Sequence, residues 1–399
     1  MSFEKLKLAY VSPLPPEKSG ISFYSKELIP YLSEYYDITL VVEQEEVESS
    51  ISEKFRVIKY NEFLKTFKDF DRILCQFGNS PFHKHMLYMI EEVPCVVVLH
   101  DVFLSNLINW AHHTGYYPNI LFEEAYYSHG WSALLEMKKD LGNFIMKYPL
   151  NARVINNSIG VIVHSKHAFD IIKDFYAQVN EEKFRIIPQI RRVENFTDNN
   201  EEVKGFLISS FGYITPLKKP DIIIKGFALS KVSKLPNVRL CFIGESSPPS
   251  YSEELLKLAK SLNIKDKVSI TGFVDEETYR EYLRNSSICI QLRSNSKGET
   301  SRAVLDIMAS KKPLIVNSHG SFKEIPKDAC LMLTEDPSPE DVACAIDKLY
   351  EDSKLRSEIS ERAYKYIREF HAPEKVAKEY FEAIEEFYNN STLSEFLDK

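Results

Sequence analysis

The chain has 399 residues, which is enough for two or three domains. Hydrophobic residues make up 44% of it and charged residues 27%, a balance that excludes a mainly disordered protein. The formal net charge is −8, and this excess of acidic residues argues against a protein that binds nucleic acid through its overall charge.

Six cysteines are scattered along the sequence without a Cys-x-x-Cys pair or a metal-ligand spacing: Cys75, Cys95, Cys241, Cys289, Cys330 and Cys344. Most lie in apolar runs, so we expect reduced core residues of a cytosolic protein. The N-terminal apolar stretch is too short for a signal peptide, and no run approaches the roughly 18 apolar residues of a membrane span. We therefore expect a cytoplasmic protein that would meet a membrane only at its inner face.

Short runs rich in β-branched residues, each followed by a segment of helical period, fill the first half of the chain. They are residues 6–12, 38–43, 55–60, 72–78, 95–101, 161–165 and 184–189. Strands that are apolar on both faces belong to buried parallel sheets. Their alternation with helices predicts a doubly wound α/β domain over residues 1–195.

The same rhythm restarts in the second half, at residues 205–214, 238–244, 268–274, 288–293, 313–318 and 329–333. A second Rossmann-like domain is therefore predicted over 206–370, after a polar linker at 196–205. Residues 371–399 contain a helical stripe of Val376, Tyr380, Phe381, Ile384 and Phe387, which predicts a helix packed on the N-terminal domain.

The stretch from Leu104 to Asn157 has many aromatic residues and no clear strand. It is interpreted as helices that pack their own core, with a wall for a ligand as the alternative. Two doubly wound domains present the carboxyl ends of their strands to ligands, so the loops after the strands are the candidate sites.

Polar residues follow several strands of the first half. Ser19 and Gly20 open a helix whose free N–H groups could meet an anion, although a plain helix cap is an equal interpretation. His100 and Asp101 end a strand, and a histidine there can donate a hydrogen bond or act as an acid or base. Asn79, His83 and Ser165 are weaker candidates of the same kind.

The second half has two basic strand-to-helix loops. Lys218 and Lys219 precede a helix that is expected to start near Pro220, a setting suited to a diphosphate. The segment ICIQLRSNSKGETSRAVLDIMASKKPLIV places Arg293 and Glu299 ahead of a helix that Thr300 or Ser301 could cap. Asp306 lies one to two turns into that helix, beside its apolar stripe. No Gly-x-Gly-x-x-Gly follows a strand, so a nicotinamide or flavin fingerprint is absent.

In this order, the motifs SGISFYSKEL, LHD, VHSKHAFD, FGYITPLKK, GFVDEETYREY and GETSRAVLDIMASKKPLIV resemble the retaining GT-B glycosyltransferases of family 4. The resemblance spans nearly the whole chain and is strongest from about 205 to 326. It implies a GT-B fold of two Rossmann-like domains that face each other across a cleft. It also implies a nucleotide-sugar donor, linked to UDP or GDP, on the C-terminal domain and an acceptor on the N-terminal domain, with no metal ion or other cofactor.

The family's roles carry over to individual positions of this sequence. Lys218 matches its diphosphate lysine, but Tyr213 stands where the motif has an arginine, so Arg293 or Arg302 is the candidate substitute. The family's paired acids align Asp306 with the ribose partner and Gly298 with the first glutamate, which leaves Glu299 one position late as the sugar partner. The remaining implied donor contacts are Gly20, Val274, Thr300 and Ser301, and His100 matches a histidine that contacts the donor sugar.

The resemblance implies transfer of a hexosyl group with retention at the anomeric carbon. The catalytic residues would be His100, Lys218 and Glu299. The acceptor would be a saccharide or a lipid-linked glycan of polysaccharide or lipopolysaccharide synthesis, and Asn79, His83 and Asp101 would contact it. Peripheral contact with a membrane and with other glycan-assembly enzymes, but none with nucleic acid, is expected. The main alternative is a non-catalytic GT-B subunit that binds a sugar nucleotide or a glycan, and an epimerase or phosphorylase is the lesser one.

Overall fold

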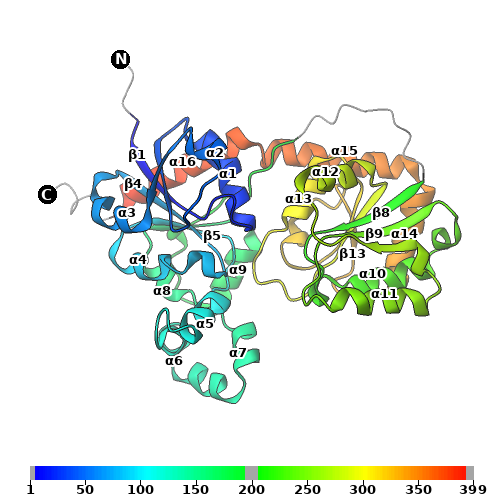
Figure 1. The fold of residues 1–399 in the computed structure, drawn as a ribbon, viewed down its shortest axis with the longest axis horizontal. Helices are drawn as coiled ribbons and strands as arrows, with labels where there is room; N and C mark the ends of the chain where they lie inside the picture. The colour runs from blue at the N-terminus through cyan, green and yellow to red at the C-terminus, as the bar shows by residue number, and fades with distance from the viewer. Residues whose placement is uncertain (1–4, 194–204, 392–399) are drawn as a thin grey trace. The chain divides into compact units, whose positions relative to one another are not determined.

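The computed structural model describes residues 5–193 and 205–391, and most of the predicted linker at 196–205 lies outside the described residues. The chain divides into two compact units (Figure 1). Unit 1 contains residues 5–190, 297–300 and 373–391, and unit 2 contains 191–193, 205–296 and 301–372. The chain thus enters unit 2 after Ile190 and leaves it after Ala372.

Unit 1 is built on a parallel sheet of seven strands among the described residues, in the order β3-β2-β1-β4-β5-β6-β7. Each predicted strand segment of the first half contains one of them. They are β1 (Lys7–Val11), β2 (Asp37–Val42), β3 (Arg56–Lys59), β4 (Arg72–Phe77), β5 (Val96–Leu99), β6 (Gly160–Val163) and β7 (Phe184–Ile186).

Helices connect these strands, as parallel pairing requires. The α-helices of unit 1 are α1 (Gly20–Leu32), α2 (Ser49–Ser52), α3 (Tyr60–Thr66), α4 (Met86–Glu92), α5 (Ser105–His113), α6 (Ile120–Lys139), α7 (Leu141–Lys147), α8 (Ala152–Asn157), α9 (Lys166–Phe175) and α16 (Pro373–Asn390). The 3-10 helices are η1 (Phe67–Asp69), η2 (Pro81–His83) and η3 (Glu181–Lys183). The aromatic stretch that lacks a strand thus forms α5 to α8.

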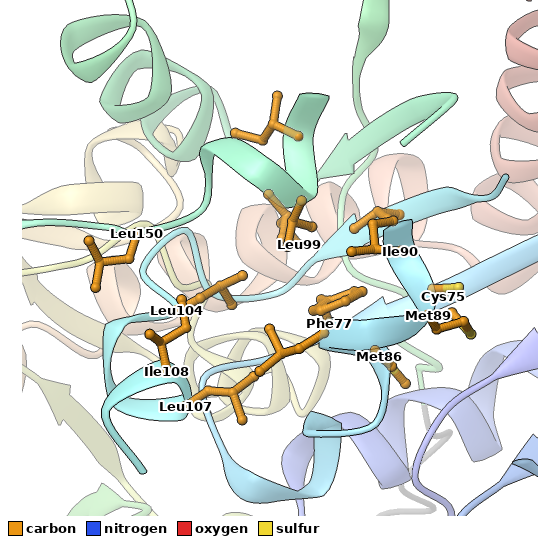
Figure 2. Close-up of a cluster of buried hydrophobic side chains, with 14 of the residues drawn as sticks. Cys75, Phe77, Met86, Met89, Ile90, Leu99, Leu104, Leu107, Ile108 and Leu150 are labelled. Carbon is orange, nitrogen blue, oxygen red and sulfur yellow. The ribbon is translucent and has the colours of Figure 1, made fainter. Parts of the chain in front are cut away.

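Both faces of this sheet are buried, because successive side chains of a strand point to opposite faces. On β1, Ala9 and Val11 join one hydrophobic cluster, whereas Leu8 and Tyr10 join the other. Figure 2 shows part of the first cluster, in which side chains of β4, β5, α4 and α5 meet around Phe77. This double burial explains why the strands are apolar without alternation.

The second cluster is closed by α16, which lies against α1 in Figure 1. The hydroxyl groups of Tyr24 and Tyr380 are 2.7 Å apart. The Arg72 guanidinium donates to the Glu385 carboxylate at 2.7 Å, and both side chains are less than one-fifth exposed. The last helix in the chain therefore belongs to the core of unit 1.

Unit 2 contains a parallel sheet of six strands among the described residues, in the order β10-β9-β8-β11-β12-β13. Each predicted strand segment of the second half again contains one. They are β8 (Phe206–Phe211), β9 (Val238–Ile243), β10 (Val268–Ile270), β11 (Ile288–Gln291), β12 (Leu314–Asn317) and β13 (Leu331–Leu333).

The α-helices of unit 2 are α10 (Pro220–Leu229), α11 (Tyr251–Ser261), α12 (Glu276–Asn285), α13 (Arg302–Ala309), α14 (Pro339–Glu351) and α15 (Ser353–Phe370). Its 3-10 helices are η4 (Pro216–Lys218), η5 (Lys231–Lys234), η6 (Lys265–Lys267) and η7 (Gly320–Glu324). Local sequence sets several starts: α10 has Pro220 in its first turn, and Ser338 and Asp341 form a capping box on α14. The protein is thus an α/β protein with two Rossmann-like parallel sheets.

Each sheet has one point where the strand order reverses, between β1 and β4 in unit 1 and between β8 and β11 in unit 2. Doubly wound sheets bind ligands beyond the carboxyl ends of the strands at such points. The loops that follow β1, β4, β8 and β11 therefore hold the best-placed candidates for a site in each unit.

The structure corrects one expectation about the cysteines. Five are buried and unpaired as thiols, but Cys344 is exposed on the outer face of α14. In the described part of the chain, no helix is both long and apolar enough to cross a membrane.

Candidate functional site

Three glycines clear the space beyond the strands on one side of the unit 2 sheet. Gly212, Gly244 and Gly272 follow β8, β9 and β10, and all three have a positive φ. A Cβ atom on Gly244 would lie 2.3 Å from the Gly212 carbonyl oxygen, and one on Gly212 would lie 2.9 Å from Lys218 Nζ. A side chain at Gly244 would collide with the backbone, and the positive φ of all three positions favours glycine.

Lys218, the predicted diphosphate residue, stands beside this glycine turn. It ends η4, just before α10 begins at Pro220. Lys219 differs from it, because its ammonium pairs with the Asp336 carboxylate and thereby lowers the pKa of Asp336. Tyr213, which stands at the place of the family's arginine, is 59% exposed. Lys219 thus pairs with a carboxylate, and the Lys218 ammonium lies near the Gly212 turn.

The loops after β8 and β11 meet at a hydrogen bond. The Ser294 backbone N–H donates to the Leu217 carbonyl at 2.7 Å. Arg293 is fixed next to it by the buried Asn317, whose side chain accepts from the Arg293 N–H at 2.8 Å and donates to its carbonyl at 2.7 Å. The Arg293 guanidinium lies 5.3 Å from the centre of the Phe322 ring. Sequence analysis missed Asn317, although it follows the last apolar residue of a predicted strand.

The segment before α13 is folded on itself. The Lys297 backbone N–H donates to the Glu299 carboxylate at 2.7 Å. Of the two predicted caps, Ser301 is the one that closes the helix, and its hydroxyl accepts from the Val304 N–H. The buried Thr300 hydroxyl has no hydrogen-bond partner among the described residues. An orphaned buried hydroxyl costs free energy that a bound ligand could recover.

Asp306 lies on α13 and is surrounded by hydrogen-bond donors from several elements. Arg191 Nη1 lies 3.0 Å from its Oδ1, and Arg302 Nε lies 3.7 Å from its Oδ2. Burial, and next the nearby Asp306 charge, raise the pKa of Tyr279 well above its usual value, so the phenol keeps its proton and donates to Oδ2 at 3.1 Å. Sequence analysis missed Arg191 and Tyr279, since both are far from Asp306 in the sequence.

Val274, the predicted neighbour of the base, is half-buried against the core beside α13, and the adjacent Phe273 is 67% exposed. Sequence analysis did not identify Phe273, the exposed aromatic residue in the loop after β10, as a separate site residue. It adds an aromatic face at the edge of the glycine-cleared strand ends.

In unit 1, the predicted His100 belongs to a buried chain of hydrogen bonds. It is 6% exposed, with Nε2 2.7 Å from the Gln76 side chain and Nδ1 3.1 Å from His164 Nε2. His164 Nδ1 in turn lies 2.9 Å from the Ile187 carbonyl oxygen. Both ring nitrogens of His100 therefore have partners within the protein, whereas a ring available to a substrate was expected. A catalytic role for His100 stays a prediction.

The burial of His100 determines the charge of its ring. Burial lowers the pKa of His100 well below its usual value, so its ring is neutral at neutral pH. His164 Nδ1 donates to the Ile187 carbonyl, because a carbonyl oxygen only accepts. On the other side of the pair, the Gln76 side-chain oxygen lies 2.7 Å from His100 Nε2. Sequence analysis missed both Gln76 and His164.

The acceptor residues predicted in unit 1 are also engaged internally. His83 is fully buried, which corrects the expectation that it meets an acceptor directly. Asn79 Oδ1 accepts from the N–H groups of Asn106 and Leu107 at the start of α5, and the Asn79 N–H donates to Asp101 at 2.9 Å. These contacts give Asn79 and Asp101 a structural role in joining the loops after β4 and β5.

The helix start after β1 is open. Ser19 caps α1 by accepting from the Ile21 N–H at 3.2 Å, so the plain cap is present. No atom would lie within 4 Å of a Cβ on Gly20. An anion could therefore still approach Gly20, and both interpretations of this turn are compatible with the structure.

The described residues contain no group of three or more histidine, cysteine, aspartate and glutamate side chains that could hold a metal ion.

The two parallel sheets place the protein in the architecture of the GT-B glycosyltransferases. Residues 192–366 match the family model Glycosyl transferases group 1.

The chain is also similar to individual proteins, in sequence or in structure. An uncharacterized glycosyltransferase of Methanocaldococcus jannaschii is 24% identical over 278 residues, 65% of this chain and 67% of the relative. HepE of Anabaena in complex with UDP has a TM-score of 0.69 and 14% identity over 95% of this chain and 99% of its own. WaaG, a glycosyltransferase involved in lipopolysaccharide biosynthesis, has a TM-score of 0.59 and 14% identity over 93% and 98%.

Proposed function

We propose that the protein is a retaining glycosyltransferase that moves a hexosyl group from a nucleotide-diphosphate sugar to a saccharide or lipid-linked glycan. The observation that carries the proposal is the group 1 domain at 192–366, with Lys218 beside a glycine turn at the point where the strand order reverses. HepE, which shares the fold, has been solved with UDP and with UDP-glucose. A UDP-linked or GDP-linked donor is the first choice to test.

In this proposal, the donor is bound by residues of unit 2 and by the segment that precedes α13. The Lys218 ammonium and the N-terminal end of α13 stabilise the negative charge that grows on the departing diphosphate. Arg293 or Arg302 supplies the positive charge that Tyr213 does not. Glu299 accepts hydrogen bonds from the sugar hydroxyls, Asp306 from the ribose hydroxyls, and Thr300 and Ser301 contribute donors ahead of α13. Val274 lies near the base.

The reaction exchanges two bonds at the anomeric carbon. The bond to the phosphate oxygen breaks, and its electron pair leaves with the diphosphate. The acceptor oxygen forms the new bond on the same face, and the acceptor proton passes to the leaving phosphate oxygen. Unit 1 holds the acceptor, with Gly20 near the phosphate and His100 near the donor sugar, and no metal ion takes part in the proposal.

One structural neighbour favours a role in the synthesis of a cell-surface glycan. WaaG acts in lipopolysaccharide biosynthesis. We therefore propose a polysaccharide or lipopolysaccharide acceptor, a cytoplasmic location and peripheral contact with the membrane and other glycan-assembly enzymes.

The proposal is tested with UDP-, GDP-, ADP- and dTDP-sugars, with and without EDTA. We expect one nucleotide diphosphate to raise the thermal midpoint and its sugar nucleotide to be turned over at the same rate in EDTA. Tyr213 in place of an arginine favours a second candidate, a non-catalytic subunit that binds the sugar nucleotide. Stabilisation by a nucleotide without turnover of its sugar, with acceptors of several classes present, would support that subunit and contradict the enzyme.

A further inference from the structure

Arg191 is the first residue of unit 2. Its backbone N–H donates to the His371 carbonyl at 2.9 Å, next to the place where the chain leaves the unit. Its side chain is 8% exposed and reaches α13, where the guanidinium Nη1 lies 3.0 Å from Asp306 Oδ1. The backbone of Arg191 is thus hydrogen-bonded to the C-terminal end of α15, whereas its guanidinium forms an ion pair with a residue of α13.

The Asp306 carboxylate is fixed from two directions. Arg191 occupies Oδ1, and the Tyr279 hydroxyl donates to Oδ2 at 3.1 Å. An ionised carboxylate has about four lone-pair sites, so these two partners leave acceptor capacity on both oxygens. Two hydroxyl groups on adjacent carbon atoms could use that remaining capacity.

The burial of this carboxylate makes the cation necessary. Asp306 is 13% exposed, and a carboxylate that is largely removed from water needs a close positive partner to stay charged. Arg302, four residues earlier on the same helix, is 37% exposed and 3.7 Å away. Arg191 is therefore the closer and more buried of the two cations, and its planar guanidinium also sets the direction of the carboxylate.

We propose that Arg191 is a positioning residue for the donor nucleotide, which acts by orienting Asp306 so that its carboxylate accepts from the ribose hydroxyls. The inference rests on the proposed function, because it takes the role of Asp306 from there. Arg191 itself need not touch the nucleotide. Its effect on affinity therefore passes through Asp306.

The test is calorimetric binding of UDP, GDP, ADP and dTDP to the full chain and to four variants: Arg191→Ala, Arg191→Lys, Asp306→Asn and the double variant Arg191→Ala/Asp306→Asn. We expect Arg191→Ala to weaken the Kd of the nucleotide that binds by about 10- to 100-fold, the range of one hydrogen bond to a charged group. Arg191→Lys keeps the charge and should recover part of the loss. In the Asp306→Asn background, removing Arg191 should change the Kd less than twofold.

Arg72→Ala is the matched control, because Arg72 forms an ion pair with Glu385 of similar burial within unit 1. It should lower the thermal midpoint and leave the Kd unchanged. An unchanged Kd in both Arg191 variants, or additive losses in the double variant, would overturn the positioning role while the proposed function stands. If none of the four nucleotides binds the wild type, both proposals fail. If Arg191→Ala does not fold, the comparison of Arg191→Lys with the wild type decides.

Turnover gives a second readout. With the sugar nucleotide that is turned over, Arg191→Lys should raise KM more than it lowers kcat, because it weakens donor binding. A fall of kcat at unchanged KM would contradict an action through the ribose partner.

Discussion

The carboxyl ends of the two parallel sheets use their polar residues in different ways. In unit 1, His100, Asn79 and Asp101 are hydrogen-bonded to neighbouring loops, and His83 is buried. In unit 2, glycines clear the strand ends, Lys218 stands beside one of them, and Tyr213 is exposed. The same topology thus carries hydrogen-bonded polar side chains at the strand ends of one unit and a glycine turn beside a lysine at those of the other. A site for a charged ligand is better prepared in unit 2.

The largest effect should come from Lys218→Ala. If Lys218 stabilises the leaving diphosphate, its loss should reduce turnover by about 10²- to 10³-fold, as for a lost electrostatic contact to a transition state. Thermal stability should change little, because the residue lies in a loop. Steady-state kinetics and thermal unfolding measure the two effects.

Lys219→Ala is the control for this variant, because it removes a neighbouring lysine whose partner is the exposed Asp336. Its turnover should stay close to that of the wild type. Comparable losses of turnover in the two variants, or a parallel loss of stability in Lys218→Ala, would show that the charge of Lys218 has no special role.

The glycine turn of unit 2 is tested by Gly244→Ala. The added Cβ would lie 2.3 Å from the Gly212 carbonyl oxygen at a φ of 149°, so the backbone must shift. We expect a loss of roughly 1–3 kcal/mol in the free energy of unfolding, measured with denaturant. Gly142→Ala in α7 is the control, because its Cβ meets only an ordinary contact and the helix favours alanine. Equal stabilities of the two variants would contradict the tight turn.

The buried histidines of unit 1 predict a pH dependence of stability. Burial lowers the pKa of His83 to about 3, so between pH 6.5 and about 3 the unfolded chain binds a proton that the folded chain refuses. The contribution of His83 is intact above pH 6.5 and is lost as the pH falls, at about 1.4 kcal/mol per pH unit.

Comparison with His83→Gln isolates this contribution, because other groups titrate equally in both proteins. One of them is Glu124, whose pKa burial raises to about 7 and which acts in the opposite direction. Denaturant unfolding from pH 7 to pH 4 should show the wild type losing stability faster than the variant. Parallel curves would mean that His83 is accessible to protons in the folded state.

The smallest effect is expected at Gly20. The space around it is open, so Gly20→Ala should change the free energy of unfolding by less than about 1 kcal/mol. A phosphate that approaches the start of α1 closely would meet the new methyl group, and turnover should then fall by about tenfold. Full turnover with unchanged stability would leave only the helix cap as the role of this turn.

The sequence predicts the strands well and the partners of polar residues poorly. Strands such as β1 and β5 are buried on both faces, so their continuous apolar runs are visible without any knowledge of neighbours. The pairing of Arg191 with Asp306, or of His100 with His164, joins residues that are 64 or more positions apart, and no local pattern encodes it. For the same reason His83 was expected at a strand end and not in the core.

The position of α16 has a consequence for the order in which the protein is made. The ribosome releases the strands of unit 1 first, but the helix that bonds to Tyr24, Arg72 and Ile73 is synthesised only after all of unit 2. Until then α1 covers this face of the first sheet without the α16 residues that complete the cluster, such as Tyr380 and Ile384. Unit 1 can therefore complete this core only after residues 373–390 have left the ribosome, and its apolar surface is exposed to aggregation until then.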